Sequence, residues 1–514
     1  MKTRKVVLAL SLLVGVTQLC AMNHNLAWPW GNPARCSNPQ TPLFAFYNRE
    51  NTTMMFDSGD EIAIYCQAAV RTGSGLTWKL SRCQVAEPFM SGEAEDLPAN
   101  LFVVRIPTKD LTPGFYDLRV KLEGLGSAKL DLFPRKGRNG EVTVQSVPPT
   151  GICTFGWKAD EMPVAEYRPA DFVQFWRNAY ADYRANVPLD ARVDSAETTF
   201  DAKAVEEYNV TNACLPYCFD PKGVKHDEVV SYKVSWAGPD GGRVSAWLAR
   251  PKAPGRYPAM LVLPGAGTNP RPRPLDHARH GYVAVDVHVH GRDCENPDRG
   301  RTEGYAENGE PIRFPLEKVG WYNVYLRAAR GVDYLASLPF VDAERIVTVG
   351  GSQGGRLSIV VPALEPRVAA TVPSIAHGGN VPYLEWFQRM NGNVFKEGRP
   401  NYWGYYPDET LRKRDGRDLV GAPPVAEGEM MRSEAYFDIM NFAPEVKCPV
   451  LMSMGLVDYI SFAPGVYATY LRCFSPDKTI VPVAGHGHDW FSAFDRMAYR
   501  WLDKKLDISQ VDGK

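Results

Sequence analysis

The residues best suited to chemistry in this 514-residue chain are a serine and the glycines beside it. Ser352 lies in the sequence Gly350-Gly351-Ser352-Gln353-Gly354, after a β-branched run at 346–349 and before a helical pattern at 356–364. A serine between a strand and a helix needs small neighbours, because the backbone turns sharply there and exposes the hydroxyl. The pattern therefore predicts Ser352 as the nucleophile of an acyl-transfer reaction.

A serine hydroxyl is a poor nucleophile at neutral pH, so it needs a base and an acid that orients the base. Asp458 follows a strand-like segment at 450–454 and is the expected acid. Only two of the nine histidines, His486 and His488, lie beyond Asp458, so the base is one or the other. We prefer His486, because it comes directly after the strand-like segment at 479–483.

Acyl transfer also needs hydrogen-bond donors where negative charge develops on the carbonyl oxygen. The backbone N–H of Gln353, at the start of the helix after the nucleophile, is the first expected donor. The second is expected from the loop Pro264-Gly265-Ala266-Gly267, which follows a strand-like segment at 259–263. We assign this second donor to the N–H of Ala266.

Beyond residue 230, strand-like and helical segments alternate, which indicates a largely parallel sheet covered by helices on both faces. The expected strands are 244–248, 259–263, 283–287, 346–349, 369–372, 450–454 and 479–483, and the expected helices include 324–335 and 464–471. The aromatic-rich stretch from about 381 to 440 lacks clear periodicity and is expected to be an insertion over a strand end.

The N-terminal part has a different rhythm. From about residue 40 to 150, short alternating runs are separated by Gly, Pro and Asp, which predicts an immunoglobulin-like β-sandwich. The Pro148-Pro149 pair indicates a boundary, and a helix is expected from Asp171. The predicted organisation is a signal peptide at 1–21, a β-sandwich accessory domain at 22–150, a linker and helical entry segment at 151–230, and a catalytic domain at 231–514.

The extreme N-terminus has the layout of a secretory signal peptide. Lys2, Arg4 and Lys5 precede an apolar run, and the small residue Ala21 closes it. The protein is therefore expected to be exported, either periplasmic or secreted. Anchoring as a lipoprotein through Cys20 ranks second, because the large Leu19 precedes that cysteine. No integral membrane segment is expected in the mature chain.

Charge and cysteine content narrow the partners and the covalent cross-links. The net charge of -1, from 58 basic and 59 acidic residues, gives no indication of nucleic-acid binding. Nine of the ten cysteines would survive signal cleavage, so at least one is expected to stay unpaired within the monomer. The pairs to test first are Cys66 with Cys83 and Cys214 with Cys218.

From about residue 165 to the end, the sequence resembles the acetyl xylan esterase and cephalosporin C deacetylase family. The resemblance rests on the segments 171–176, 247–251, 341–346, 350–355 and 455–458. It implies a serine esterase with the α/β-hydrolase fold that removes acetyl groups from sugars and needs no cofactor. It also implies the roles of nucleophile, acid and base for Ser352, Asp458 and His486.

Three departures from that family indicate a different substrate pocket. The family usually carries Arg-Gly-Gln where this chain has His290-Gly291-Arg292, and it shows His-Glu at the base where this chain has the segment 486–489, His-Gly-His-Asp. Ala266 also replaces the usual aromatic residue of the oxyanion loop, which removes bulk near the acyl group.

Several further side chains are candidates for substrate contacts. These are His290, Arg292, His377, Trp403 and His488. His288 and His290 alternate on a strand and could suggest a metal pair. No metal site is assigned, because the chemistry of this fold needs no metal.

The predicted function is that of an exported serine esterase that removes O-acetyl groups from an acylated oligosaccharide or polysaccharide. One alternative is a methylesterase acting on uronic-acid polysaccharides, which would release methanol. Another is a noncatalytic carbohydrate-binding protein with a relic hydrolase fold. A peptidase of the prolyl oligopeptidase type is disfavoured, because its propeller would need several hundred residues.

Overall fold

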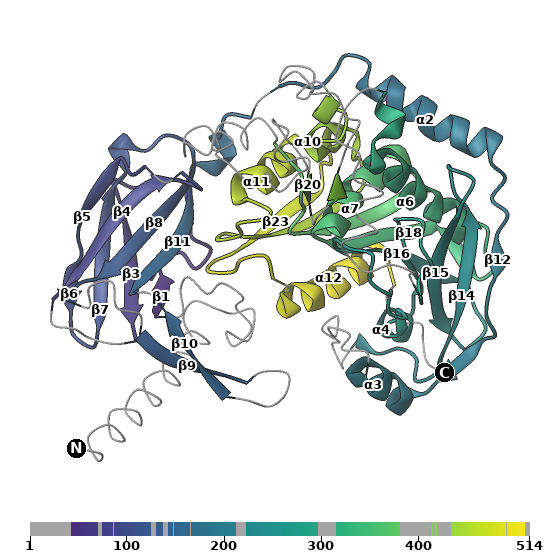
Figure 1. Cartoon of the computed structure of the whole chain (residues 1–514), viewed down its shortest axis with the longest axis horizontal. Helices are drawn as coiled ribbons and strands as arrows, with labels where there is room; N and C mark the ends of the chain where they lie inside the picture. Colours follow the sequence, from purple (N-terminus) through teal and green to yellow (C-terminus); the bar gives the residue numbers. More distant parts are fainter. Residues whose placement is uncertain are drawn as a thin grey trace.

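The computed structural model describes most of the chain. The described residues are 43–69, 74–85, 87–124, 130–136, 142–147, 149–164, 166–211, 223–296, 315–380, 413–414, 417–418, 433–489 and 491–508. The signal-peptide region, Cys214, Cys218 and Trp403 lie outside them. Two domains are visible, an all-β domain and an α/β domain (Figure 1).

The all-β domain contains two sheets. Its strands are β1 (Phe44–Tyr47), β2 (Met55–Phe56), β3 (Glu61–Ala68), β4 (Leu76–Arg82), β5 (Met90–Glu93), β6 (Glu95–Leu97), β7 (Leu101–Pro107), β8 (Gly114–Leu122) and β11 (Thr150–Trp157). One sheet has the order β1-β3-β7-β6 and the other β2-β11-β8-β4-β5. A separate hairpin, β9 (Leu130–Lys136) with β10 (Val142–Val147), is inserted between β8 and β11.

This strand order is that of an immunoglobulin-like sandwich, with β1, β3, β7 and β6 in the places of strands A, B, E and D. Alternation in β3 buries Ile62, Ile64 and Cys66 in a core shared with the opposite sheet. The hydroxyl of Tyr116 on β8 donates to the Thr112 carbonyl oxygen over 2.6 Å, which forms the tyrosine corner typical of such domains. The predicted β-sandwich is confirmed.

The sandwich extends further along the chain than the sequence predicts. Strand β11 pairs along its whole length with β8, so the domain continues to Trp157 rather than ending near residue 150. Pro149 lies just before β11, in the connection from β10. A proline pair marks a turn within a domain as readily as a linker between domains, which explains the difference.

The α/β domain is built on a ten-stranded sheet. Its strands are β12 (Arg192–Val193), β13 (Thr198–Phe200), β14 (Val229–Ala237), β15 (Arg243–Pro251), β16 (Tyr257–Leu263), β17 (Val283–Val287), β18 (Val341–Gly351), β19 (Val368–Ser374), β22 (Val450–Gly455) and β23 (Lys478–Val483). The order is β12-β14-β15-β17-β16-β18-β19-β22-β23, with β13 also pairing with β14. From β17 to β23 all neighbours are parallel, so their carboxyl ends meet at one edge.

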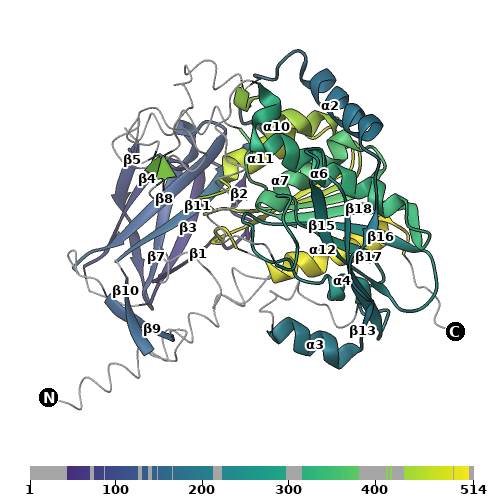
Figure 2. The same cartoon turned by 45° about the vertical axis from the view of Figure 1, so that its right-hand side comes forward.

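Helices cover both faces of this sheet (Figures 1 and 2). One face carries α2 (Phe172–Asn186), α6 (Gly320–Ala336), α7 (Gln353–Leu364), α10 (Ile439–Phe442) and α11 (Ala463–Arg472), and the other carries α3 (Ala202–Thr211), α4 (Leu275–Arg279) and α12 (Ser492–Lys505). Each face of the sheet packs in its own hydrophobic core. Strand β16 contributes to both, because Leu261 lies in one core and Met260 in the other. The predicted α/β-hydrolase fold is confirmed, including all seven expected strands.

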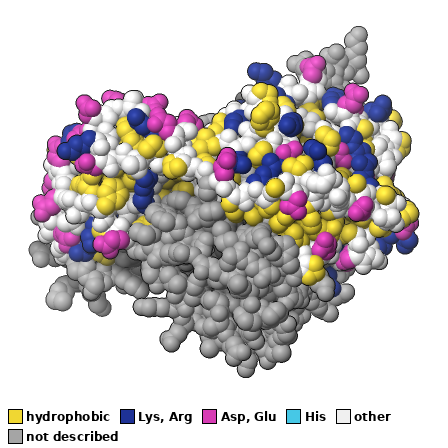
Figure 3. All heavy atoms as spheres, turned by 90° about the horizontal axis from the view of Figure 1, so that it is seen from above, with side chains coloured by type: hydrophobic (Ala, Val, Ile, Leu, Met, Phe, Trp, Pro, Cys, Tyr) yellow, Lys and Arg dark blue, Asp and Glu magenta, His cyan; other side chains and the backbone are white. Residues whose placement is uncertain are grey.

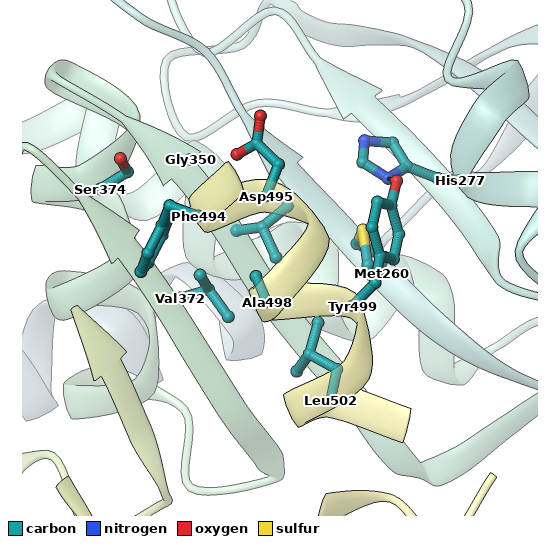
Figure 4. A pocket seen from close by; sticks show the side chains of 11 residues that line it. Met260, His277, Gly350, Val372, Ser374, Phe494, Asp495, Ala498, Tyr499 and Leu502 are labelled. Atoms are coloured by element: carbon teal, nitrogen blue, oxygen red, sulfur yellow. Dashed lines mark hydrogen bonds between the residues drawn. The ribbon is translucent and has the colours of Figure 1, made fainter. Parts of the chain in front are cut away.

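A mostly apolar pocket lies between α12 and the sheet (Figure 4). Phe494 and Leu502 of α12 line it, together with Val372 and Met260 of the strands. The hydroxyl of Tyr499 lies 2.5 Å from Nδ1 of His277 at one side. Burial lowers the pKa of His277 to about 3, so this histidine is a neutral packing residue.

The two domains are in contact through α11. Phe115 of β8 packs edge-on against Tyr467, with the ring centroids 5.4 Å apart. The Tyr467 hydroxyl also donates to Oδ1 of Asp160 over 2.8 Å. Both aromatic residues are buried. The sandwich therefore packs against the helix that follows the Asp458 loop.

The cysteine prediction for the sandwich is wrong where it can be checked. Cys66 and Cys83 are both buried thiols and are not joined to each other. Cys66 points into the core from the middle of β3, whereas the Cys83 thiol hydrogen-bonds to the buried Asp117. Residues on neighbouring strands are bridged only when their Cβ atoms lie close and face each other.

The surface agrees with the near-neutral charge of the sequence. Figure 3 shows basic and acidic side chains mixed over the described parts of both domains on that face. Among the residues that the structure describes, none of the helices combines the length and the apolar character needed to cross a bilayer.

Candidate active site

Ser352 lies at a strained turn between β18 and α7. Its φ of 59° and ψ of -117° fall outside the ordinary regions for a residue with a side chain. The turn is possible because its neighbours are glycines: a Cβ on Gly350 would lie 2.6 Å from the Leu263 carbonyl oxygen, and one on Gly354 only 2.1 Å from it. The motif thus presents the serine hydroxyl at the carboxyl edge of the sheet.

Asp458 follows β22 at the same edge and is fully buried. Its Oδ1 accepts hydrogen bonds from the backbone N–H groups of Ile460 and Ser461, each over 2.8 Å. Its Oδ2 lies 2.8 Å from Nδ1 of His488. Both carboxylate oxygens therefore have partners, which fixes the orientation of the side chain.

His488 joins the acid to the serine. Its Nε2 lies 2.8 Å from Oγ of Ser352, while its Nδ1 contacts Asp458. The ring is partly exposed, with 16% of the side-chain surface accessible. This is the arrangement in which an imidazole can take the serine proton while the carboxylate holds the opposite nitrogen.

The predicted base, His486, does not contact Ser352 in the structure; His488 lies between Ser352 and Asp458 instead. The His486 ring is buried edge-on against Phe491, with centroids 4.7 Å apart, and its Nδ1 lies 3.9 Å from Asp489. Burial lowers the pKa of His486 to about 3, which makes it a weak base. The chain needs two more residues after His486 before an imidazole reaches Ser352.

A local signal could have identified His488. The resembled family carries His-Glu at its base, and in this chain His488 is followed directly by the acidic Asp489. The prediction gave more weight to distance from the strand end. The loop is longer than that reading assumes, because Val457 N–H donates to the His486 carbonyl oxygen over 3.0 Å and so holds His486 beside the acid loop.

We expect Gly455→Ala to displace the loop after β23 that carries His486 and His488. A Cβ at Gly455 would lie 2.3 Å from the carbonyl oxygen of Gly487 and 2.6 Å from that of His486. A shift of about 1 Å in a catalytic group costs on the order of 100-fold in rate, so kcat should fall by about that factor. The measurement is kcat on p-nitrophenyl acetate, with Gly242→Ala as the control, because a Cβ there meets nothing closer than 3.5 Å. Equal activity of the two variants would contradict the expected displacement.

The predicted oxyanion donors differ in what the structure says about them. Gln353 begins α7 directly after the nucleophile, where the backbone N–H groups of a first helical turn lack intrahelical partners. Ala266 is exposed on the loop after β16. The assignment of its N–H as the second donor stays a prediction.

Three other candidates for substrate contacts, His290, Arg292 and His377, lie among the described residues. His290 is buried, with its Nε2 3.1 Å from Nε2 of Gln353, and Arg292 is half-buried on the loop that follows. The His377 N–H donates to the Ser352 carbonyl oxygen over 3.3 Å. Burial, with Arg356 and His488 nearby, lowers the pKa of His377 well below its usual value.

His288 and His290, the possible metal pair, have no third ligand among the described residues. The rings of His288 and His290 lie 6.2 Å apart, between centroids. Within the described ranges, no group of three or more His, Cys, Asp or Glu side chains is placed to hold a metal ion.

Comparisons with known proteins identify a family to which most of the α/β domain is similar. The family described as "Acetyl xylan esterase (AXE1)" matches residues 211–505. Among curated proteins, acetyl esterase Axe7A of Xylanibacter ruminicola is 29% identical over 276 residues, which is 51% of this chain and 56% of that protein. The chain spans about half the length of the curated relatives it matches.

Two solved structures match about two thirds of this chain. Acetyl xylan esterase 1 of Thermoanaerobacterium sp. JW/SL YS485 is 21% identical with a TM-score of 0.49, and the match covers 68% of this chain and 98% of that one. Acetyl xylan esterase of Paenibacillus sp. R4 is also 21% identical, with a TM-score of 0.46 and coverage of 67% and 98%.

Proposed function

Because the chain belongs to the acetyl xylan esterase (AXE1) family of α/β-hydrolases, we propose that it is a serine esterase that removes O-acetyl groups from carbohydrates. The observation that carries the proposal is the continuous contact from Ser352 Oγ to His488 Nε2 and from His488 Nδ1 to Asp458 Oδ2, each 2.8 Å. An acid, a base and a hydroxyl in this order are the parts that acyl transfer needs.

The reaction proceeds in two halves. His488 Nε2 takes the proton of Ser352 Oγ as this oxygen bonds to the acetyl carbon, and it then gives the proton to the departing sugar oxygen. Water attacks the resulting acyl-enzyme, with His488 again accepting a proton, and acetate leaves as the serine is restored. Asp458 keeps the proton of the neutral ring on Nδ1 and stabilises the imidazolium that forms in each half.

Negative charge on the acetyl oxygen would be stabilised by backbone donors. The Gln353 N–H and the Ala266 N–H are proposed for this role. The proposed mechanism uses no cofactor, since its nucleophile, base and oxyanion donors are all protein groups.

The proposed substrate is an acetylated xylan or a related acetylated oligosaccharide, as the family implies. The proposal includes export, which places the enzyme where plant polysaccharides are accessible. Its support is the signal-peptide pattern of residues 1–21.

Product analysis on two polysaccharides tests the reaction. With acetylated xylan we expect acetate release by the wild type and none by Ser352→Ala, since the variant lacks the nucleophile. With a methyl-esterified uronic-acid polysaccharide we expect no methanol. Methanol as the main product would replace the proposal with a methylesterase.

A serine-directed fluorophosphonate probe separates both activities from noncatalytic binding. Labelling of the wild type but not of Ser352→Ala is expected, because only an activated serine reacts at a useful rate. An unlabelled wild type that still binds xylan would support the relic-fold alternative instead.

A further inference from the structure

We propose that His290 is a positioning residue of the esterase. It holds the Gln353 side chain, and this side chain in turn joins α7 to the loop at 264–267, which is proposed to carry the second oxyanion donor. The inference deepens the proposed function and rests on it. Nε2 of Gln353 lies 3.1 Å from Nε2 of His290. The same nitrogen lies 3.5 Å from the carbonyl oxygens of both Pro264 and Gly265.

The identity of the partners fixes the direction of these contacts. Carbonyl oxygens only accept hydrogen bonds, so two of them facing one end of the Gln353 amide place its NH₂ group there. That group only donates, and His290 Nε2 must therefore accept. The proton of the neutral ring then lies on Nδ1.

The surroundings keep His290 in this neutral form. Burial lowers its pKa to about 3, with His288, Arg327 and Arg271 adding like-charge repulsion against a protonated ring. Arg327 donates to the Val289 carbonyl oxygen over 3.2 Å, and Arg271 pairs with the buried Asp286 over 2.7 Å. His290 is thus neutral, and can accept a hydrogen bond, at neutral pH.

The contact matters because it joins two elements that each carry an oxyanion donor. Gln353 supplies one backbone N–H, and the loop Pro264–Gly267 is proposed to supply the other. Gly354 already lies close to this loop, since a Cβ there would lie 3.2 Å from the Pro264 carbonyl oxygen. The Gln353 amide holds the two donors at a fixed separation before substrate arrives, and His290 restrains that amide.

Four variants test the role of the contact between His290 and Gln353. His290→Ala removes the acceptor, and His290→Gln replaces it with a side-chain oxygen of similar reach. Gln353→Met keeps the backbone donor but removes the amide. His288→Ala is the matched control, because His288 is a second buried histidine of the same segment, with its ring centroid 6.2 Å from that of His290.

Complete loss of one oxyanion donor costs about 10²- to 10³-fold in kcat, and a displaced donor costs less. We expect His290→Ala and Gln353→Met each to lower kcat on p-nitrophenyl acetate by roughly 10- to 100-fold with little change in KM. Combining them should cost little more than either alone. His290→Gln should recover most of the kcat, and His288→Ala should remain within about threefold of the wild type.

A boronic acid that forms a tetrahedral adduct with the serine gives a second readout. Its affinity should fall in parallel with kcat in His290→Ala, since the adduct needs the oxyanion donors. Thermal melting establishes that each variant is folded. If His290→Ala does not fold, the Gln353→Met and His290→Gln pair still decides the question.

Three results would overturn the proposal: an unchanged kcat in Gln353→Met, an equal loss in His288→Ala, or no recovery in His290→Gln. Failure of the proposed function looks different, because Ser352→Ala would then keep its activity or the wild type would release no acetate.

Discussion

Alanine in place of His488 is expected to lower kcat on p-nitrophenyl acetate by roughly 10⁴- to 10⁶-fold, the range seen when a serine triad loses its base. Among the described residues, the His488 ring is the base that lies within hydrogen-bond distance of Ser352 Oγ, so the variant lacks this proton acceptor. The loss should appear in kcat, since the small ester has few contacts that depend on the imidazole. Stopped or long-time assays at high enzyme concentration measure the residual rate.

His486→Ala is the matched control, because it removes the same side chain two residues earlier in the same loop. We expect it to retain kcat within about tenfold, with lower stability from the cavity beside Phe491. Combining His488→Ala with Ser352→Ala should cost little beyond either change alone, because triad members act as a unit. The reverse ranking of the two histidines, in folded protein, would return the role of base to His486.

Asp458→Asn should lower kcat by about 10⁴-fold through the tautomer of His488. The carboxylate accepts the Nδ1 proton, whereas an amide nitrogen at the same place would favour a proton on Nε2, which then points at Ser352 and cannot accept. The backbone donors from Ile460 and Ser461 bind Oδ1, so an asparagine can keep its oxygen there and direct its NH₂ at the ring.

Asp489→Asn controls for the loss of one negative charge close to the base. It changes the residue next to His488 without removing the carboxylate that contacts the ring, so we expect a fall in kcat of less than about tenfold. The comparison uses the same small ester across pH 5 to 9. Comparable losses in the two variants would show that net charge, rather than the Asp458 contact, sets the reactivity.

The parallel core and the strand-to-helix turn at Ser352 were predictable from sequence because their signals are local. Apolar runs such as 259–263 define buried strands, and the glycines around Ser352 define the turn by the space that they leave. Asp458 was predictable from its place after the next suitable strand.

The base was not predictable in the same way, because the path of a loop depends on contacts that the local sequence does not contain. The backbone bond from Val457 to His486 and the close approach of Gly455 to Gly487 decide which imidazole reaches the serine. The bridge from His290 to Gln353 likewise joins residues that are far apart in sequence. Such a pair gives no signal in a single sequence.

The contact between the sandwich and α11 determines how the two domains of this protein can be separated or exchanged. Phe115 packs edge-on against Tyr467, and the Tyr467 hydroxyl donates a hydrogen bond to Asp160. Removal of the sandwich would therefore uncover the ring of Tyr467, which is buried in the intact protein. If sandwich domains were exchanged between relatives, the residues of α11 that contact the sandwich would have to be exchanged with them. A catalytic fragment that begins after Trp157 would need a polar residue in place of Tyr467, to limit aggregation through the uncovered ring.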